Sequence, residues 1–511
     1  MEATCGYAGC RREVARDGMC IFHLPNKNLQ ERLKFKAYLL GEIARMQKDS
    51  ALRMIDLSGF RFPEPAYKFP AGTRFEKAIN FREVVFEGQA EFSGSVFLGP
   101  AVFDQTKFSG NATFDGVRLS NVASFVECEF SSNATFSNSE FSTSAEFGLA
   151  KFSGNAVFSN AKFSGNAIFS GTKFSAYAAF RETKFLAYSS FEGVEFSGFA
   201  DFAKSKFSGQ AEFLYAKFSA FATFDEAEFL DDVFFDVVEF LGDVSFDSAK
   251  FSGMASFYNS KIAGTTTFRA TLFQTKNDQI LASPIKQHTI FEKINVDTSG
   301  EVRFEGGICM SRVSLHHADI RRFSFLDVKW GRLGGRASIM EHGMLKEPKR
   351  LSKDAEILPD VAPEHVQHIY VRLRRNLERG AGRYPEAGDF FINEKEMRKL
   401  ILQEGRRWPR LENLPEWVIL KVYGGLALYG ESIMRPIFWI AVTVFAFTTL
   451  KIVSFRLQTA DAKPYLDFLM ESVMAFFQMR SEPGLDALER LISVPILGSL
   501  FIALKRKFER R

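Results

Sequence analysis

The chain has 511 residues, which is too long for one ordinary hydrophobic core and predicts two or more structural units. With 46% hydrophobic and 25% charged residues, its composition is that of a folded protein and excludes wholesale disorder. A net charge of +4 excludes a basic field over the whole molecule, and five cysteines in this length exclude a disulfide scaffold.

Three cysteines and a histidine lie close together near the start of the chain, in the order Cys5, Cys10, Cys20 and His23. Three thiolates and one imidazole are a standard closed ligand set for tetrahedral zinc. The spacing therefore predicts a Cys3His zinc knuckle over residues 1–28, whose metal stabilises the fold and has no open position for catalysis. The alternative is three reduced cysteines and a surface histidine that bind no metal.

A helix is predicted directly after the knuckle. Residues 29–48 have the apolar spacing of an amphipathic helix, and we assign residues 29–54 to a segment that caps the next domain. One face of this helix would carry Leu29, Leu33, Leu40 and Ile43. No apolar run follows Met1, so we expect no cleaved signal peptide and a chain whose bulk stays in a reducing cytosol.

Phenylalanine dominates the next part of the chain, which contains most of the 58 Phe; the whole chain has only 12 Tyr and 4 Trp. At a period of 11, Phe occupies eighteen of eighteen positions from Phe81 to Phe268. A second register of the same period, five residues out of step, is interrupted only by Leu119 and Ile262. Ordinary cores share this role among Leu, Val and Ile, so the excess of Phe has a periodic cause.

This pattern excludes a helix and predicts a solenoid over residues 55–330. Ser-Gly steps recur between the phenylalanines and would break a helix in every unit. A small residue precedes most of the phenylalanines by two positions, so each side of a coil would place one large and one small side chain inside. The phenylalanines that we expect in the structural core include Phe147, Phe152, Phe158, Phe163, Phe169 and Phe174.

Residues 155–174, which read NAVFSNAKFSGNAIFSGTKF, resemble the Phe-rich form of the pentapeptide-repeat family, in which the spacing alternates between five and six. The resemblance implies an all-β, right-handed quadrilateral β-helix. The phase is interrupted over residues 274–288. Weaker coils are then expected around Phe291, Phe304, Leu315 and Phe325.

The composition changes after residue 330. Residues 331–362 are rich in Gly, Lys and Pro and lack an apolar period, so we assign them to a linker. Residues 363–432 have a strongly charged helical pattern, which predicts cytosolic and juxtamembrane helices with a break at residues 380–382. The expected fold class is thus a β-helix followed by an α-helical linker region and an α-helical hairpin.

Residues 433–511 are predicted to form this hairpin, as two transmembrane spans. The run 436–455 carries one charge, Lys451, and is long enough to cross a bilayer. The run 491–504 is shorter, but a basic tail follows it. Under the positive-inside rule these flanks place both termini in the cytosol, so we expect a multi-pass protein of the plasma (inner) membrane.

A third apolar stretch, residues 465–479, lies between the two runs and is too short to cross a membrane. Span, short re-entrant helix, loop and span is the subunit plan of a two-helix pore. The candidate pore residues are Phe476, Phe477, Gln478, Met479, Arg480 and Ser481.

The part of the chain from residue 370 to residue 511 resembles the potassium-channel-like module that often follows pentapeptide repeats. The resemblance rests on the stretches 370–374, 386–391 and 429–431 and on Gly498. A potassium filter carries glycines after the pore helix, whereas residues 475–481 contain none, so ion selectivity and conduction stay open.

Three functions fit this organisation. The first is an oligomeric, ion-channel-like pore, with four copies expected from the channel resemblance, coupled to a cytosolic rod. The second is a membrane-tethered scaffold without conductance, and the third is a defence-type effector that permeabilises the membrane when triggered. We expect membrane lipid and further copies of the chain as partners. A further candidate partner is an unknown cytosolic protein or ligand that binds the rod.

Nucleic-acid binding and enzymatic activity are not expected. The resemblance raises the question of DNA mimicry, because nine acids and no base lie from Asp225 to Asp247, but a solvated face explains this cluster. Residues 316–319 pair two histidines with an aspartate, and the sequence adds no nucleophile motif or phosphate loop to them. We therefore predict that the chain is not an enzyme.

Overall fold

The computed structural model describes the chain in eight segments, namely residues 4–7, 10–70, 72–273, 289–346, 361–379, 384–458, 463–479 and 484–509. The chain divides into two compact units. Unit 1 comprises Met1–Arg332, and unit 2 comprises Leu333–Pro348 and Glu356–Arg511.

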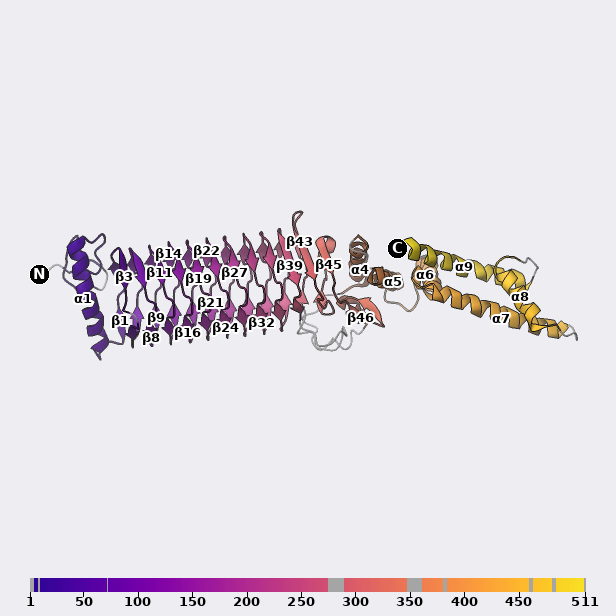
Figure 1. The fold of residues 1–511 in the computed structure, drawn as a ribbon, viewed down its shortest axis with the longest axis horizontal. Helices are drawn as coiled ribbons and strands as arrows, with labels where there is room; N and C mark the ends of the chain where they lie inside the picture. Colours follow the sequence, from indigo (N-terminus) through magenta and orange to yellow (C-terminus); the bar gives the residue numbers. More distant parts are fainter. Residues whose placement is uncertain are drawn as a thin grey trace. The chain divides into compact units, whose positions relative to one another are not determined.

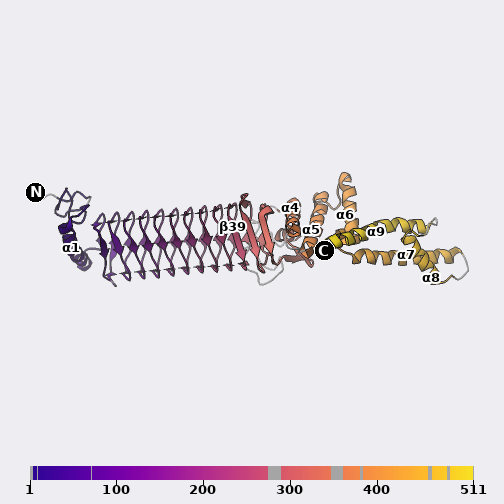
Figure 2. The same ribbon diagram turned by 45° about the horizontal axis from the view of Figure 1, so that its top comes forward.

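Unit 1 contains a parallel β-solenoid of about twelve turns, which confirms the predicted fold class (Figure 1). Four sheets of 12, 11, 12 and 10 strands run along it, and successive strands of the chain belong to successive sheets (Figure 2). The sheets begin with β1 (Met54–Asp56), β2 (Arg61–Phe62), β3 (Ala66–Lys68) and β4 (Arg74–Phe75). They end with β44 (Val313–Ser314), β42 (Asn295–Val296), β45 (Phe323–Leu326) and β40 (Leu272–Phe273).

The strands between these ends are short and strictly in register. Most are two residues long, and only β39 (Thr265–Arg269) and β43 (Glu301–Glu305) reach five. Each pairs with a strand one coil further on, as β19 (Ala156–Val157) does with β23 (Ala178–Ala179) through Ala156 and Ala178. The small residue before each phenylalanine therefore forms a column of its own. The predicted phase break, residues 274–288, lies outside the described residues, and the coils resume beyond it at β41 (Thr289–Ile290).

Phenylalanine rings fill the interior of the solenoid. The ring of Phe158 stacks on those of Phe136 and Phe180, one coil before and one coil after, at centroid distances of 4.8 and 5.0 Å. It meets the rings of Phe147 and Phe169 edge to face at 5.3 and 5.4 Å. Both geometries are favourable for aromatic pairs, which explains why one residue type recurs every 11 positions. The following side chains are all buried: Phe147, Phe152, Phe158, Phe163, Phe169 and Phe174.

One turn in every half-coil has a left-handed backbone. The residue two positions after each phenylalanine of the Phe81 register has a φ between 53° and 68°, and four of these eighteen residues are glycines. A residue with a Cβ atom loses about 1–2 kcal/mol in this conformation. The least suited of them is Val237, whose φ is 56°, because its side chain branches at Cβ.

We expect Val237→Asn to stabilise unit 1 by about 1 kcal/mol, because asparagine tolerates the left-handed region. The reciprocal change, Gly116→Val, should destabilise it by about 1–2 kcal/mol. Gly116 has a φ of 64°, and an added Cβ would meet no atom within 4 Å, so this variant tests the backbone alone. The measurement is the urea concentration at the midpoint of unfolding of the full chain, monitored by circular dichroism. A lower midpoint for Val237→Asn would contradict the strain argument.

The N-terminal helix of unit 1 is α1 (Leu29–Lys48), and a capping box between Asn28 and Glu31 begins it. The face assigned to it from the sequence is wrong for its three leucines and right for Ile43. Its buried side chains are Phe35, Leu39, Ile43 and Met46, whereas Leu29, Leu33 and Leu40 are 70%, 57% and 48% exposed. The ring of Phe35 packs edge to face on Phe22 and Phe62, at 5.7 and 5.3 Å, and these contacts set which face is buried.

Unit 2 is α-helical. After β46 (Gly331–Leu333) and β47 (Arg336–Ser338), its helices are α2 (Met340–Lys346), α4 (Pro363–Arg379), α5 (Tyr384–Gln403), α6 (Leu414–Ala427), α7 (Met434–Gln458), α8 (Tyr465–Phe476) and α9 (Leu485–Glu509). Helix α4 packs against α5, and α7, α8 and α9 pack together. The predicted helix break at residues 380–382 lies outside the described residues, between α4 and α5.

Part of the predicted linker, residues 331–362, belongs instead to the core of unit 2. Its described residues include β47 and α2, and the side chains of Ser338 and His342 are buried. The hydroxyl of the buried Tyr370 explains this, because it lies 2.8 Å from both Ser338 Oγ and His342 Nδ1. A buried phenol requires such partners. Residues 347–360 lie outside the described residues.

Candidate functional site

The four predicted zinc ligands come together at the N-terminal end of unit 1. One ligand atom from each of them lies within 4.8 Å of all the others. The Sγ atoms of Cys5 and Cys20 lie 3.4 and 3.2 Å from Nδ1 of His23. Cys10 Sγ lies 3.9 Å from Cys20 Sγ. Tetrahedral zinc, with bonds of about 2.3 Å to sulfur and about 2.0 Å to nitrogen, separates its ligands by about 3.5–3.8 Å. The side chains therefore lie close enough to bind one metal ion.

A contact with the first coil of the solenoid orients His23. Its Nε2 lies 3.1 Å from the Ser58 carbonyl, so Nε2 donates this hydrogen bond and Nδ1 faces the thiols as an acceptor. Burial lowers the pKa of His23, which keeps its imidazole neutral and able to bind a cation. Burial raises the pKa of the Cys20 thiol to about 11, so its thiolate form needs a nearby positive charge.

Two glycines shape the chain around these ligands. Gly18 has a φ of 72° in the loop between the two ligand pairs, where the Met19 N–H donates to the Arg16 carbonyl. Gly59 has a φ of 67°, and a Cβ there would lie 2.2 Å from the ring of Tyr7. The ring of Tyr7 in turn stacks on His23, at 4.2 Å between centroids. A glycine at position 59 thus lets the knuckle lie against the first coil.

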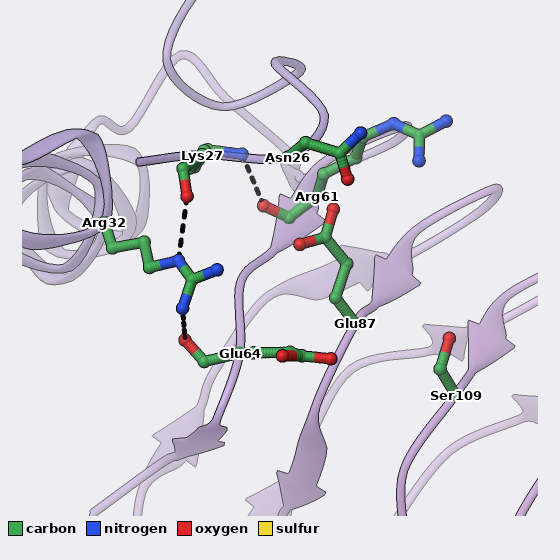
Figure 3. Close-up of a pocket in the computed structure, with 7 residues that line it drawn as sticks. All are labelled: Asn26, Lys27, Arg32, Arg61, Glu64, Glu87 and Ser109. Atoms are coloured by element: carbon green, nitrogen blue, oxygen red, sulfur yellow. Dashed lines mark hydrogen bonds between the residues drawn. The ribbon is translucent and has the colours of Figure 1, made fainter. Parts of the chain in front are cut away.

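A polar pocket of about 470 Å³ lies beside the knuckle, where α1 meets the first coils (Figure 3). Its central cation, Lys27, is buried and donates to the carbonyls of Leu24 and Arg61, at 2.5 and 2.8 Å. Arg32 donates to the Glu64 carbonyl at 3.3 Å. Burial lowers the pKa of Lys27 to about 8. Both cations are engaged by backbone carbonyls, so these side chains fasten the N-terminal segment to the solenoid.

Among the described residues, two helices are long and apolar enough to cross a membrane, Met434–Gln458 and Leu485–Phe508. The second is longer than the apolar run 491–504 from which it was predicted. Pro495 lies inside it, and a proline there leaves one carbonyl of the preceding turn without its helical partner. Helices α7 and α9 lie side by side, and the half-length α8 packs against both (Figures 1 and 2).

The predicted pore residues occupy different environments. Phe476 is buried in a cluster with Val444 and Ile496 of the neighbouring helices, so its side chain packs inside the hairpin. The side-chain amide of Gln478 donates to Ser493 Oγ of α9, at 2.9 Å. Phe477 is 45% and Met479 is 78% exposed. The remaining two candidates, Arg480 and Ser481, lie outside the described residues.

Sequence reasoning missed a buried cluster of charges between α7 and α9. Lys451 Nζ of α7 lies 2.7 Å from Asp486 Oδ1 and 2.9 Å from Glu489 Oε2, both of α9. All three side chains are buried. Charges in an apolar hairpin are costly unless they are paired, so this cluster fixes how α7 packs against α9. Lys451 looked like an isolated charge in the sequence, because Glu489 follows it by 38 residues.

Four overlapping segments of the solenoid, residues 71–118, 103–150, 136–184 and 147–195, match the family described as pentapeptide repeats (9 copies). The chain carries pentapeptide repeats. An uncharacterized protein of Methanocaldococcus jannaschii is 26% identical to it over 227 residues, which cover 40% of this chain and 46% of that protein. The chain thus spans about half the length of this relative. The search of solved structures gave no significant match.

The acidic cluster on the pentapeptide-repeat solenoid takes part in hydrogen bonds between coils. Asp225 Oδ1 accepts from the backbone N–H of Asp247, one coil further on, at 3.1 Å. Asp236 Oδ1 accepts from that of Tyr258 at 3.0 Å. The same kind of bond to the next coil is made by Asp232, Asp243 and Asp247. Over half of the nine acids therefore stabilise the stacking of the repeats, and the cluster gives no reason to propose DNA mimicry.

Two stretches on which the channel resemblance rests meet around Arg506, near the end of α9. Its guanidinium donates to the Tyr429 carbonyl at 3.0 Å and to Glu431 at 2.9 Å. It also lies 3.8 Å from the centroid of the Phe391 ring of α5. The turn that it holds, Leu428–Gly430, has positive φ at all three residues. In this pentapeptide-repeat chain, the end of the hairpin is thus fastened to the helices that precede it.

Proposed function

We propose that this pentapeptide-repeat protein is an oligomeric protein of the plasma (inner) membrane, whose C-terminal hairpin is an ion-channel-like pore module coupled to the repeat rod. The observation that carries the proposal is the half-length helix α8, packed against two helices of span length. A single pair of spans cannot enclose a water path, so the pore is shared between copies, and the channel resemblance suggests four.

The orientation follows from the charges at the two ends of the hairpin. Arg435, Lys505, Arg506 and Lys507 lie at the end where α7 begins and α9 finishes. The opposite end carries Asp467, Glu471 and Asp486 and, among its described residues outside the buried cluster of Lys451, the smaller basic set Arg456, Lys463 and Arg490. By the positive-inside rule, both termini and the repeat rod are in the cytosol.

A labelling experiment on the full chain in intact cells tests this topology. We expect Met479→Cys to react with a membrane-impermeant maleimide added from outside, because Met479 is exposed and lies beyond α8. The matched control, Arg406→Cys, precedes both spans and should react only after the cells are opened. If Met479→Cys were labelled only in opened cells, α7 and α9 would not cross the membrane as proposed.

Conductance separates the pore from the membrane-tethered scaffold. The scaffold is favoured by the burial of Phe476 and by the absence of glycine in residues 475–479. The purified oligomer in a planar bilayer should carry a current that the variant truncated before α7 does not carry. A folded, correctly oriented oligomer without current would leave the scaffold as the function, and current only after a trigger would favour the effector.

We further propose that Cys5, Cys10, Cys20 and His23 hold one structural zinc ion. When bound, zinc would supply a charge that stabilises the thiolates and would join the segment of Cys5 and Cys10 to that of Cys20 and His23. We expect about one zinc per purified chain, lost in Cys10→Ser. The control is Cys128→Ser, because Cys128 is buried in the solenoid and donates to the Phe103 carbonyl, as serine also can. Equal metal content in the two variants would exclude this site.

A further inference from the structure

Helix α6 exposes an apolar stripe. Val418, Ile419 and Val422 are 42%, 65% and 49% exposed. Their spacing of three and four residues places them on one face of the helix. On another side, Glu416 receives two hydrogen bonds from Arg398 of α5, at 2.8 and 2.9 Å. A helix whose polar residue is held by the protein while its apolar face is open is typical of a surface that meets a non-aqueous partner.

Helix α6 lies at the level where the hairpin begins. Trp439 in the first turns of α7 donates from Nε1 to the Gly425 carbonyl of α6, at 3.3 Å. Arg435 donates to the Gly424 carbonyl at 3.4 Å. Helix α6 also packs against α9, whose last turns carry the basic residues. The stripe is therefore continuous with the end of the hairpin that carries the positive charge.

Tryptophan and basic side chains lie along one side of the stripe. The rings of Trp408 and Trp417 lie 5.4 Å apart, and Lys421 Nζ lies 5.5 and 4.5 Å from their centroids. Arg406 and Arg407 are exposed beside this pair. Tryptophan and cations together are typical of segments at the lipid headgroups.

We propose that the stripe of α6, with Arg406, Arg407 and Lys421, lies in the headgroup region of an anionic phospholipid bilayer. A second copy of the chain is a poorer partner, because a symmetric contact would bring these cations together. The inference rests on the proposed function, since α6 reaches the headgroups only if α7 and α9 span the membrane. An interfacial helix binds through its buried apolar area and through attraction to anionic lipid, and both contributions are present here.

Photo-crosslinking of the full chain tests this, in nanodiscs of phosphatidylcholine with a minority of phosphatidylglycerol. Benzoyl-phenylalanine replaces Ile419, and mass spectrometry identifies what it captures. Phe445, which is exposed in the middle of α7, is replaced in the same way as the control for the span, and the exposed Glu412 as the control for water. We expect lipid adducts at positions 419 and 445 and none at 412.

The outcomes separate the two proposals. One result would overturn the interfacial helix alone. In it, position 445 gives lipid adducts, while position 419 gives either no adduct or an adduct to a second chain. No lipid adduct at 445 would overturn the membrane-spanning hairpin and this inference with it. Arg406→Gln and Arg407→Gln should each lower the share of phosphatidylglycerol among the adducts at 419 by up to about fivefold. An unchanged share would overturn the preference for anionic lipid.

Discussion

The Phe158→Asp variant will lose the solenoid fold in the coils around position 158. Truncation of a buried phenylalanine costs about 3–5 kcal/mol, and an unpaired buried carboxyl adds a desolvation cost of several kcal/mol. Phe158 stacks on Phe136 and Phe180, so the disturbance reaches the coils on both sides. Limited proteolysis of the full chain should show rapid cleavage in these coils.

The matched control is Lys162→Asp. Lys162 begins β20 (Lys162–Phe163), four residues after Phe158, and its side chain is exposed. A surface substitution of this kind changes the free energy of unfolding by about 0.5 kcal/mol or less. If Lys162→Asp were the more damaging variant, the assignment of Phe158 to the inside of the coil and Lys162 to the outside would be wrong.

The Lys451→Met variant will lose the packing of the hairpin. The substitution takes the Lys451 ammonium away from the buried carboxylates of Asp486 and Glu489, and removal of one partner from a buried ion pair costs about 3–5 kcal/mol. The measurement is the thermal unfolding midpoint of the full chain in detergent, read from the loss of the folded peak in size-exclusion chromatography. We expect a large fall in the midpoint.

Two variants show whether the loss of the buried Lys451 charge is the cause. Lys463→Met breaks the pair with Glu471, which is partly exposed, and should change the midpoint little. Replacing Lys451, Asp486 and Glu489 together with Met, Leu and Met removes all three charges and should restore most of the loss. If the triple variant were as unstable as Lys451→Met, the charge argument would be wrong.

The parts of the fold that could be predicted from sequence are those in which contacts repeat at a fixed short separation. A coil contacts its neighbour 22 residues away, so the partners of Phe158 are visible as a period in the sequence. The cysteine and histidine spacing of the knuckle is equally local. The left-handed turns had no such signal, because residues as different as Val237 and Asn160 occupy them.

The remaining features depend on contacts that no local pattern reports. The buried face of α1 follows Phe35, since the rings of Phe22 and Phe62 pack on it, and leucine spacing alone pointed to another face. The partners of Lys451 lie on a different helix. The aspartates that accept hydrogen bonds from the next coil had a usable signal, because Asp225 and Asp236 each follow a core phenylalanine directly. We interpreted these acids only as surface charge.

The N-terminal segment also covers the first edge of the solenoid. A parallel stack of coils ends in an open sheet edge, whose unpaired backbone groups can add another strand from another molecule. Here three side chains occupy that edge: Lys27 binds the Arg61 carbonyl, Arg32 that of Glu64 and Gln47 that of Arg74. The N–H of Arg61 is bound by the Phe22 carbonyl. The segment that contains Cys5, Cys10, Cys20 and His23 thus covers this edge, and we expect its removal to leave an edge to which a strand of another molecule can add.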